Sequence, residues 1–156
     1  MDNMILLKPI ATVRSPRAEV RNDHWGAVVA EIVLEDWLPA EALDGLETFS
    51  HVEVIFHFDR VAESAIIAGA RHPRNNPDWP RVGIFAQRGK NRPNRLGLTT
   101  ARVLRRDGRT LLVHGLDAVD GTPVLDIKPV MIEFLPREPV TQPAWAAELM
   151  AEYWLA

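Results

Sequence analysis

Cysteine is absent from the 156 residues of this sequence. Without thiols the chain can form neither a disulfide framework, a thiolate zinc site nor a cysteine nucleophile, which removes several enzyme classes. Long apolar stretches are lacking too. No run approaches the roughly 18 residues that span a bilayer, and the N-terminal residues have no basic region followed by a long apolar core. These absences predict a soluble cytoplasmic protein without a membrane segment.

Several motifs of nucleotide and hydrolase chemistry are also missing. The sequence has no glycine-rich loop of the G-x-G-x-x-G or G-x-x-x-x-G-K-[ST] kind, no H-E-x-x-H and no G-x-S-x-G. Its histidines are scattered without metal-ligand spacing, at His24, His51, His57, His72 and His114. A doubly wound methyltransferase or dehydrogenase is therefore disfavoured, and we expect no metal.

Charge is distributed unevenly along the chain. The net charge is −3, but residues 71–109 hold eleven Arg or Lys against two acids, Asp78 and Asp107, which leaves seven cations and nineteen acids elsewhere. Two interpretations remain open. The basic segment either pairs with the acidic remainder across the fold, or it presents a surface to an anion.

Short strands joined by turn-rich loops dominate the pattern. Residues 50–59 alternate most clearly, with Val52, Val54, Phe56 and Phe58 on one face of a predicted strand. Further strands are predicted over residues 4–13, 27–34, 98–104 and 110–113, the last two joined by an Asp107-Gly108 turn.

Helices are few and peripheral in this pattern. We expect short helical turns over residues 39–46 and 61–69, and a C-terminal helix over residues 142–155. The sequence therefore predicts an all-β fold, a closed barrel with a few short helices around it. A single domain over residues 1–156, with its core in residues 4–135, fits this length. The apolar stripe of the C-terminal helix is interpreted as core or dimer interface: Trp145, Leu149, Met150, Tyr153 and Trp154.

The most unusual stretch is residues 82–99, in which an apolar run gives way to a basic loop and then becomes apolar again. We interpret its flanks as two strands. Placing four cations on one ordered connection costs charge repulsion, so the loop is expected to meet an anionic or hydrogen-bond-accepting ligand. These cations are Arg88, Lys90, Arg92 and Arg95.

Asp126 and Lys128 lie two residues apart in a second cluster of turn residues and charges. In an extended segment such residues share a face. The pair forms either a salt-bridged edge or a site that faces the basic loop.

Four ordered blocks resemble the TsaA-like (TrmO-type) S-adenosylmethionine-dependent tRNA methyltransferases. They are I-A-T-V-R-S-P at 10–16, L-E-T-F-S-H-V at 46–52, G-I-F-A through R-P-N to G-L at 83–98, and L-D followed by D-G-T-P-V-L-D-I-K-P at 116–129. The resemblance implies a closed β-barrel, usually dimeric, that binds S-adenosylmethionine and methylates N6 of threonylcarbamoyl-adenosine at tRNA position 37, in the anticodon loop.

The same resemblance implies roles for individual residues. Asp126 is the first choice to accept a proton from the methyl acceptor and His51 the second, with Lys128 stabilising developing negative charge. Four cations are expected to contact RNA: Arg14, Arg17, Lys90 and Arg95. Residues of the last two blocks are expected to bind the cofactor: Phe85, Ala86, Gln87, Arg88, Arg92, Pro93, Asn94, Leu96, Gly97, Leu116, Asp117 and Thr122.

Departures from the family pattern motivate two alternatives. Gln87, residues 89–91, Arg95 and Leu96 stand at places where tRNA-modifying members commonly read A-T-R-S-P-x-R-P-N-P-I-G. One alternative keeps the cofactor but methylates another, small acceptor. The other is a noncatalytic barrel that binds RNA or an anion through the basic segment.

Overall fold

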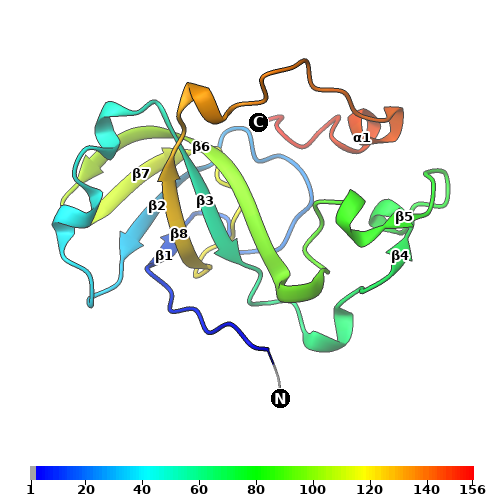
Figure 1. Cartoon of the computed structure of the whole chain (residues 1–156), viewed down its shortest axis with the longest axis horizontal. Coiled ribbons are helices and arrows are strands. Elements are labelled where there is room, and N and C mark those ends of the chain that lie inside the picture. The colour runs from blue at the N-terminus through cyan, green and yellow to red at the C-terminus, as the bar shows by residue number, and fades with distance from the viewer. Residues whose placement is uncertain (1–2) are drawn as a thin grey trace.

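The fold is a closed six-stranded β-barrel with a small lobe beside it (Figure 1). The computed structural model describes residues 3–156. The strand order around the barrel is β1-β2-β7-β6-β3-β8 and each paired neighbour is antiparallel. The predicted all-β class and closed barrel are confirmed. The barrel strands are β1 (Ala11–Arg14), β2 (Val29–Leu34), β3 (His51–His57), β6 (Leu96–Asp107), β7 (Thr110–His114) and β8 (Pro123–Pro129).

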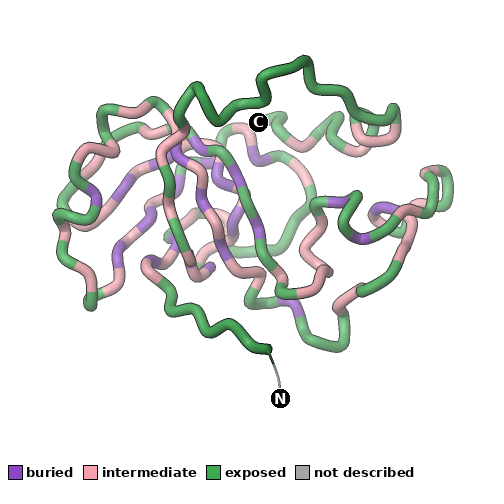
Figure 2. The backbone as a smooth tube through the Cα atoms, in the orientation of Figure 1, coloured by how far each residue is buried: buried purple, intermediate pink, exposed green. Residues whose placement is uncertain are grey.

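Alternation along β3 shows how the sequence closes the barrel. Val52, Val54 and Phe56 point inward and are at most 1% exposed, while the residues between them are half-buried. Alternate side chains point to opposite faces of a strand, so an apolar residue at every second position builds one core face. Burial is concentrated on the barrel strands (Figure 2). The other strands contribute Ala11, Val13, Ala30, Ile32, Leu34, Ala101, Leu111, Val113 and Val124 to the same core.

The longest strand, β6, changes partner along its length. Residues 96–102 pair with β3, whereas only residues 102–107 pair with β7. The predicted hairpin through Asp107 and Gly108 is confirmed by the β6–β7 pairing. Among the strands of residues 3–156, residues 96–101 therefore have no partner on one edge, which we call the free edge of β6. Unpaired backbone groups there need other hydrogen-bond partners.

A lobe built from the residues between β3 and β6 lies at the side of the barrel (Figure 1). In it β4 (Ala70–Arg71) and β5 (Val82–Gly83) form a separate two-stranded sheet. Two strands flank the basic loop as predicted, β5 before it and β6 after it, but the first is shorter than its apolar flank. Only two residues of the first flank are strand, and the chain then turns so that Ile84, 1% exposed, anchors it in the lobe. The basic loop thus joins the lobe to the barrel.

Short helices connect these strands, and two predicted helices are shorter than expected. Residues 61–69 contain one 3-10 turn, and the C-terminal helix ends at Leu149. After the helix, carbonyls of residues 152–155 accept hydrogen bonds from the backbone N–H groups of residues 24–26, and this pairing takes the place of further helical turns. The helices are η1 (Ala40–Leu43), η2 (Leu46–Thr48), η3 (Glu63–Ala65), η4 (Pro73–Asn75), η5 (Ile84–Ala86), η6 (Pro93–Arg95), η7 (Ile132–Phe134) and α1 (Ala144–Leu149).

The first strand also begins later than predicted. β1 starts at Ala11, which pairs with Leu34, the last residue of β2. Ile10 still donates to the Val124 carbonyl at 2.8 Å and accepts from the Glu35 N–H at 2.9 Å, but Pro9 before it has no N–H to donate. Residues 4–7 are consequently exposed, with Leu6 at 96%. Trp37 holds the preceding residues, since its Nε1 donates to the Pro9 carbonyl at 3.0 Å.

Candidate functional site

The basic loop between η5 and β6 is held by its own side chains. Gln87 is only 7% exposed, and its Nε2 donates to the carbonyls of Arg71 and Val82, each at 3.1 Å. Arg92 Nη1 donates to the Gln87 carbonyl at 2.6 Å. These contacts close the loop on the β4–β5 sheet. Gln87 therefore positions the loop within the lobe.

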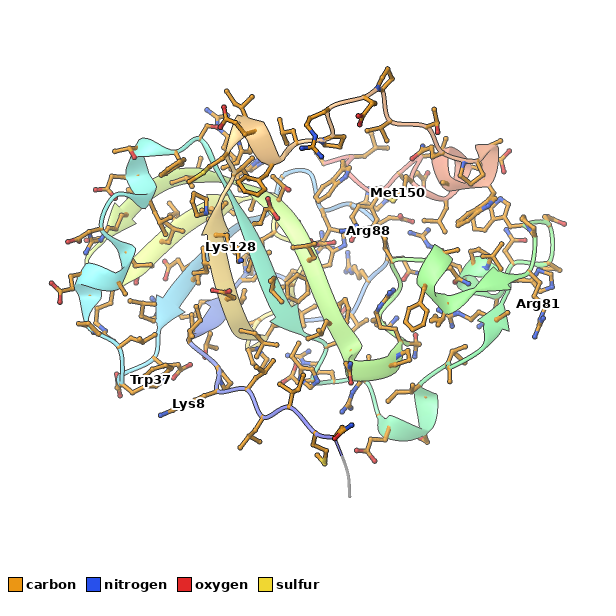
Figure 3. All side chains as sticks on the ribbon, in the orientation of Figure 1. Lys8, Trp37, Arg81, Arg88, Lys128 and Met150 are labelled. Atoms are coloured by element: carbon orange, nitrogen blue, oxygen red, sulfur yellow. The ribbon has the colours of Figure 1, made fainter. Side chains whose placement is uncertain are left out.

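Arginines of the loop bind carbonyl oxygens rather than acids. Arg95 Nη1 donates to the Val61 carbonyl at 2.6 Å, and Arg88 Nη2 donates to the Leu98 carbonyl on the free edge of β6. A carbonyl contact orients a guanidinium without cancelling its charge. Figure 3 shows Arg88 between β6 and the C-terminal segment.

Pairing with acids neutralises little of the basic segment. Within residues 3–156 only Arg74 and Arg106, of the cations in residues 71–109, lie within ion-pair distance of a carboxylate. Arg74 pairs with Asp23 at 2.9 Å, and Arg106 pairs with Asp44. The structure therefore favours the second sequence interpretation, a surface that faces an anion.

Backbone strain and unsatisfied donors coincide in and around this loop. Asn94 and Arg95 have positive φ angles of 62° and 50°, a left-handed conformation that is costly for residues with a Cβ. The Nε atoms of Arg71 and Arg95 are buried and have no hydrogen-bond partner among residues 3–156. A buried donor without an acceptor costs free energy, so these two atoms add to the local strain.

A carboxylate with two hydroxyl donors lies at the free edge of β6. Thr99 Oγ1 donates to Asp117 Oδ1, and the Tyr153 hydroxyl donates to Asp117 Oδ2. Burial, and then the negative charge of Asp117, raises the pKa of Tyr153 well above its ordinary value of 10.0, while Arg74 and Arg88 act in the opposite direction. Tyr153 is therefore a neutral donor in the folded protein.

Sequence reasoning missed Thr99 and Tyr153 as neighbours of Asp117. Tyr153 lies 36 residues beyond Asp117, and in the sequence it belongs to an apolar stripe. Of that stripe, Met150 and Trp154 are exposed at 36% and 46%, and the others are half-buried. No local signal points to this hydroxyl, because its contact depends on how the C-terminal segment folds back.

The predicted cofactor residues divide into buried and exposed sets. Leu116 is a core residue, Thr122 donates to the Val119 carbonyl at 2.6 Å, and Gly97 faces inward against the Phe56 ring. These three residues are used by the fold. Phe85 is 76% exposed, with the Arg92 guanidinium 6.0 Å from its ring centroid. The residues of the predicted set that are exposed to a ligand are Phe85, Ala86, Arg88, Asn94 and Leu96.

The predicted catalytic residues lie on the outer face of the barrel. Asp126 and Lys128 are exposed on β8, and His51 is half-buried at the start of β3. Figure 3 shows Lys128 on β8, with β3 between it and β6. Ile55 of β3 pairs with both Asp126 and Leu98, so the Asp126 backbone is two strand spacings, about 10 Å, from the carbonyl that Arg88 binds.

Two details of this outer face bear on its chemistry. Neither Asp126 nor Lys128 lies within ion-pair distance of an opposite charge in residues 3–156, so the salt-bridged edge is not formed. His51 Nδ1 is 2.7 Å from Ser50 Oγ.

The four residues predicted to contact RNA differ in the partners that their side chains have within the protein. Arg14 pairs with Glu31, and Arg17 lies over the Trp25 ring at 4.4 Å and donates to the Asp23 carbonyl at 3.2 Å. Arg95 is bound to Val61, as described for the loop. Lys90 has no ion pair among the residues described.

No group of residues suited to hold a metal ion occurs within residues 3–156. In the same part of the chain no helix is long and apolar enough to cross a membrane.

Comparison with known proteins places these features in a family. The model of the tRNA-methyltransferase O N-terminal domain matches residues 14–134. A probable S-adenosyl-L-methionine-binding protein of Archaeoglobus fulgidus is 36% identical over 129 residues, which is 81% of this chain and 34% of the relative. The tRNA (adenine(37)-N6)-methyltransferase of Escherichia coli is 38% identical over 122 residues, 73% of this chain and 52% of the relative.

The fold comparison agrees with the sequence comparison. A crystal structure of TrmO from Pseudomonas aeruginosa superposes with a TM-score of 0.73 at 27% identity, covering 93% of this chain and 63% of that one. The chain thus spans a third to a half of these two curated relatives and under two thirds of the solved structure. Because the family model covers most of its length, the chain belongs to the family of the tRNA-methyltransferase O N-terminal domain.

Proposed function

We propose that this chain is an S-adenosylmethionine-dependent methyltransferase that methylates N6 of threonylcarbamoyl-adenosine 37 in tRNA. The observation that carries the proposal is the pair of contacts on neighbouring residues of β6, where Arg88 donates to the Leu98 carbonyl and Thr99 donates to Asp117. S-adenosylmethionine brings a carboxylate and ribose hydroxyls that can accept from arginine, and hydroxyl and ammonium groups that can donate to a carboxylate. The Escherichia coli relative is a tRNA (adenine(37)-N6)-methyltransferase, which supports N6 of adenine 37 as the methylated position.

The cofactor's contribution is an electrophilic methyl group on a cationic sulfonium. The chain has to hold the acceptor nitrogen in line with that methyl group, so alignment supplies most of the rate enhancement. Phe85, 76% exposed beside Arg92, offers an apolar face for a base or for the adenine ring. The loop therefore contributes binding and orientation rather than acid or base chemistry.

The outer face supplies the groups for proton transfer. Asp126 accepts the proton that the acceptor nitrogen loses, and Lys128 stabilises the negative charge that develops there. His51 is the second choice for the proton acceptor. Because β3 separates β8 from β6, the methyl acceptor has to span the face between Asp126 and the basic loop, as an extended modified adenosine does.

A tRNA substrate accounts for the unneutralised charge of residues 71–109. Phosphate contacts by Arg and Lys dominate nucleic-acid affinity, and here the carbonyl-bound arginines keep their charge. We assign the anticodon loop to this surface, with Lys90 and Arg95 of the basic loop as its first phosphate contacts and Arg14 and Arg17 as further candidates. A cytoplasmic location follows from this substrate.

The functional unit is proposed to be a homodimer. Apolar side chains that a soluble monomer would bury are exposed at two places, at residues 4–7 and around η7. Ile132 and Phe134 are each 80% exposed. Exposed apolar patches of this kind mark interaction surfaces.

The experiment is methyl transfer to tRNA purified from a strain that lacks this gene. With the purified chain and S-adenosylmethionine, nucleoside mass spectrometry should show threonylcarbamoyl-adenosine gaining one methyl group. Asp126→Asn should lower the rate while cofactor affinity stays the same, and Glu53→Gln on the same outer face is the matched control. Cofactor binding without transfer to tRNA would favour a small acceptor, and absence of cofactor binding would favour a noncatalytic barrel.

A further inference from the structure

Residues 144–155 lie across both parts of the molecule, and we call this segment the strap (Figure 1). In the lobe, Trp79 Nε1 donates to Glu148 Oε2 at 2.8 Å. At the barrel, the backbone N–H groups of His24, Trp25 and Gly26 donate to carbonyls of residues 152, 153 and 155 at 3.2, 2.8 and 3.2 Å. The strap therefore ties the connection between β1 and β2 to the lobe.

The contact at Gly26 is too close for any other residue. A Cβ on Gly26 would lie 1.8 Å from the Trp154 carbonyl oxygen, a backbone atom that cannot rotate away. The backbone of Gly26 is not left-handed, so its conformation by itself would admit alanine. Glycine is needed at this position only because the strap is seated against it.

The strap delivers the Tyr153 hydroxyl to Asp117. With Thr99 on one carboxylate oxygen and Tyr153 on the other, the side chain of Asp117 is held from two sides. A carboxylate has about four acceptor positions, so it can still accept hydrogen bonds from a ligand. Residues 144–155 lie beyond the 14–134 segment that the family model matches, so this arrangement is additional to the matched domain.

We infer that the strap is part of the cofactor site and that Tyr153 is a positioning residue that holds Asp117 ready for the cofactor. This inference rests on the proposed function, because it assigns Asp117 to S-adenosylmethionine. A side chain that is already fixed loses little conformational freedom when the ligand binds, whereas ordering a free one typically weakens affinity. The hydroxyl thus acts through Asp117 and not by contact with reacting atoms.

Tyr153→Phe tests this role because it removes one oxygen and keeps the ring. We expect S-adenosylmethionine to bind the variant roughly tenfold more weakly by calorimetry, as for a lost hydrogen bond to a charged group. The urea midpoint of unfolding should fall as well, because this hydrogen bond is also present in the free protein, so the affinity is measured well below that midpoint. Val140→Ala, at an exposed position before the strap, is the control and should bind like wild type.

A double-mutant cycle distinguishes a Tyr153 hydroxyl that acts by positioning Asp117 from one that only stabilises the fold. In an Asp117→Asn background, Tyr153→Phe should no longer weaken binding, because the hydroxyl acts through the carboxylate. Equal weakening in both backgrounds, or tighter binding by Tyr153→Phe, would overturn the inference; tighter binding would mean that the strap occludes the site. Wild-type protein that binds no S-adenosylmethionine would overturn the proposed function as well, whereas normal binding with an unaffected Tyr153→Phe overturns this inference alone.

Gly26→Ala gives an independent test that leaves Tyr153 and Asp117 intact. The clash with the Trp154 carbonyl should displace the strap, so limited proteolysis should cleave residues 144–155 faster than in wild type. Cofactor affinity should fall at least as far as in Tyr153→Phe. A displaced strap with unchanged affinity would show that the site is complete without it and would refute the inference.

Discussion

Gly97→Ala should destabilise the barrel, although glycine at this position was predicted to serve the cofactor. A Cβ on Gly97 would meet two Phe56 ring atoms at 2.5 Å, whereas ordinary contact begins at 3.4 Å, so the ring has to retreat by about 1 Å. Phe56 is 1% exposed and packs edge-on against Phe58, with ring centroids 5.3 Å apart. The barrel core leaves this ring no free space.

Overpacking of this kind typically costs about 1–3 kcal/mol of unfolding free energy. With a urea m-value of about 2 kcal/mol/M for a chain of this size, the midpoint of unfolding should fall by roughly 0.5–1.5 M. Gly83→Ala is the matched control, because its φ is −60° and nothing lies within 4 Å of an added Cβ. That control should be neutral or slightly stabilising.

The pair Gly97 and Phe56 can be examined together. Phe56→Leu alone should destabilise by leaving a cavity, but it should also relieve the crowding caused by Gly97→Ala. The double variant is therefore expected to be more stable than the two single losses predict, by about 1 kcal/mol or more. An unchanged midpoint in Gly97→Ala, or strictly additive losses, would refute the packing explanation for this glycine.

Three further predictions follow from the site. Tyr153 is the only tyrosine, and its raised pKa contributes stability that is fully present below pH 10.0 and is lost progressively as the pH rises above it. Absorbance at 295 nm should therefore show no tyrosine ionisation until the protein unfolds, and a titration near pH 10.0 would contradict this. Asn94→Ala should cost about 1 kcal/mol in a denaturant titration because φ is 62°, whereas Asn94→Gly should not. Affinity for tRNA should fall steeply with salt, and Lys90→Ala should reduce the logarithmic slope by about one; an unchanged slope would remove Lys90 from the interface.

Local patterns in the sequence were sufficient to predict the barrel class and its clearest strands. Alternation of apolar residues at 52, 54 and 56 reappears as the inward face of β3, and the Asp107-Gly108 turn reappears as the β6–β7 hairpin. Both depend on neighbours along the chain. The extent of β1 could not be predicted, because it depends on its pairing with β2 and β8, which lie far away in the sequence.

The candidate site shows the same division. The sequence identified Arg88 and Asp117 by motif, but not their contacts with Leu98 and Thr99 on the free edge of β6. Asp126 was predicted to face the basic loop; that assignment stays a prediction, and the structure puts β3 between the two strands involved. Strand order decides such distances, and strand order is not written in any one segment.

The sequence by itself determined the residues of the basic loop and their charge, since covalent order brings Arg88, Lys90, Arg92 and Arg95 together in any fold. Only the tertiary structure decided how that charge is used: several guanidiniums orient on carbonyls, which leaves their charge available, and few pair with acids. It also brought Tyr153 to Asp117 across 36 residues. Contacts of this kind depend on the packing of distant segments, for which a local pattern carries no signal.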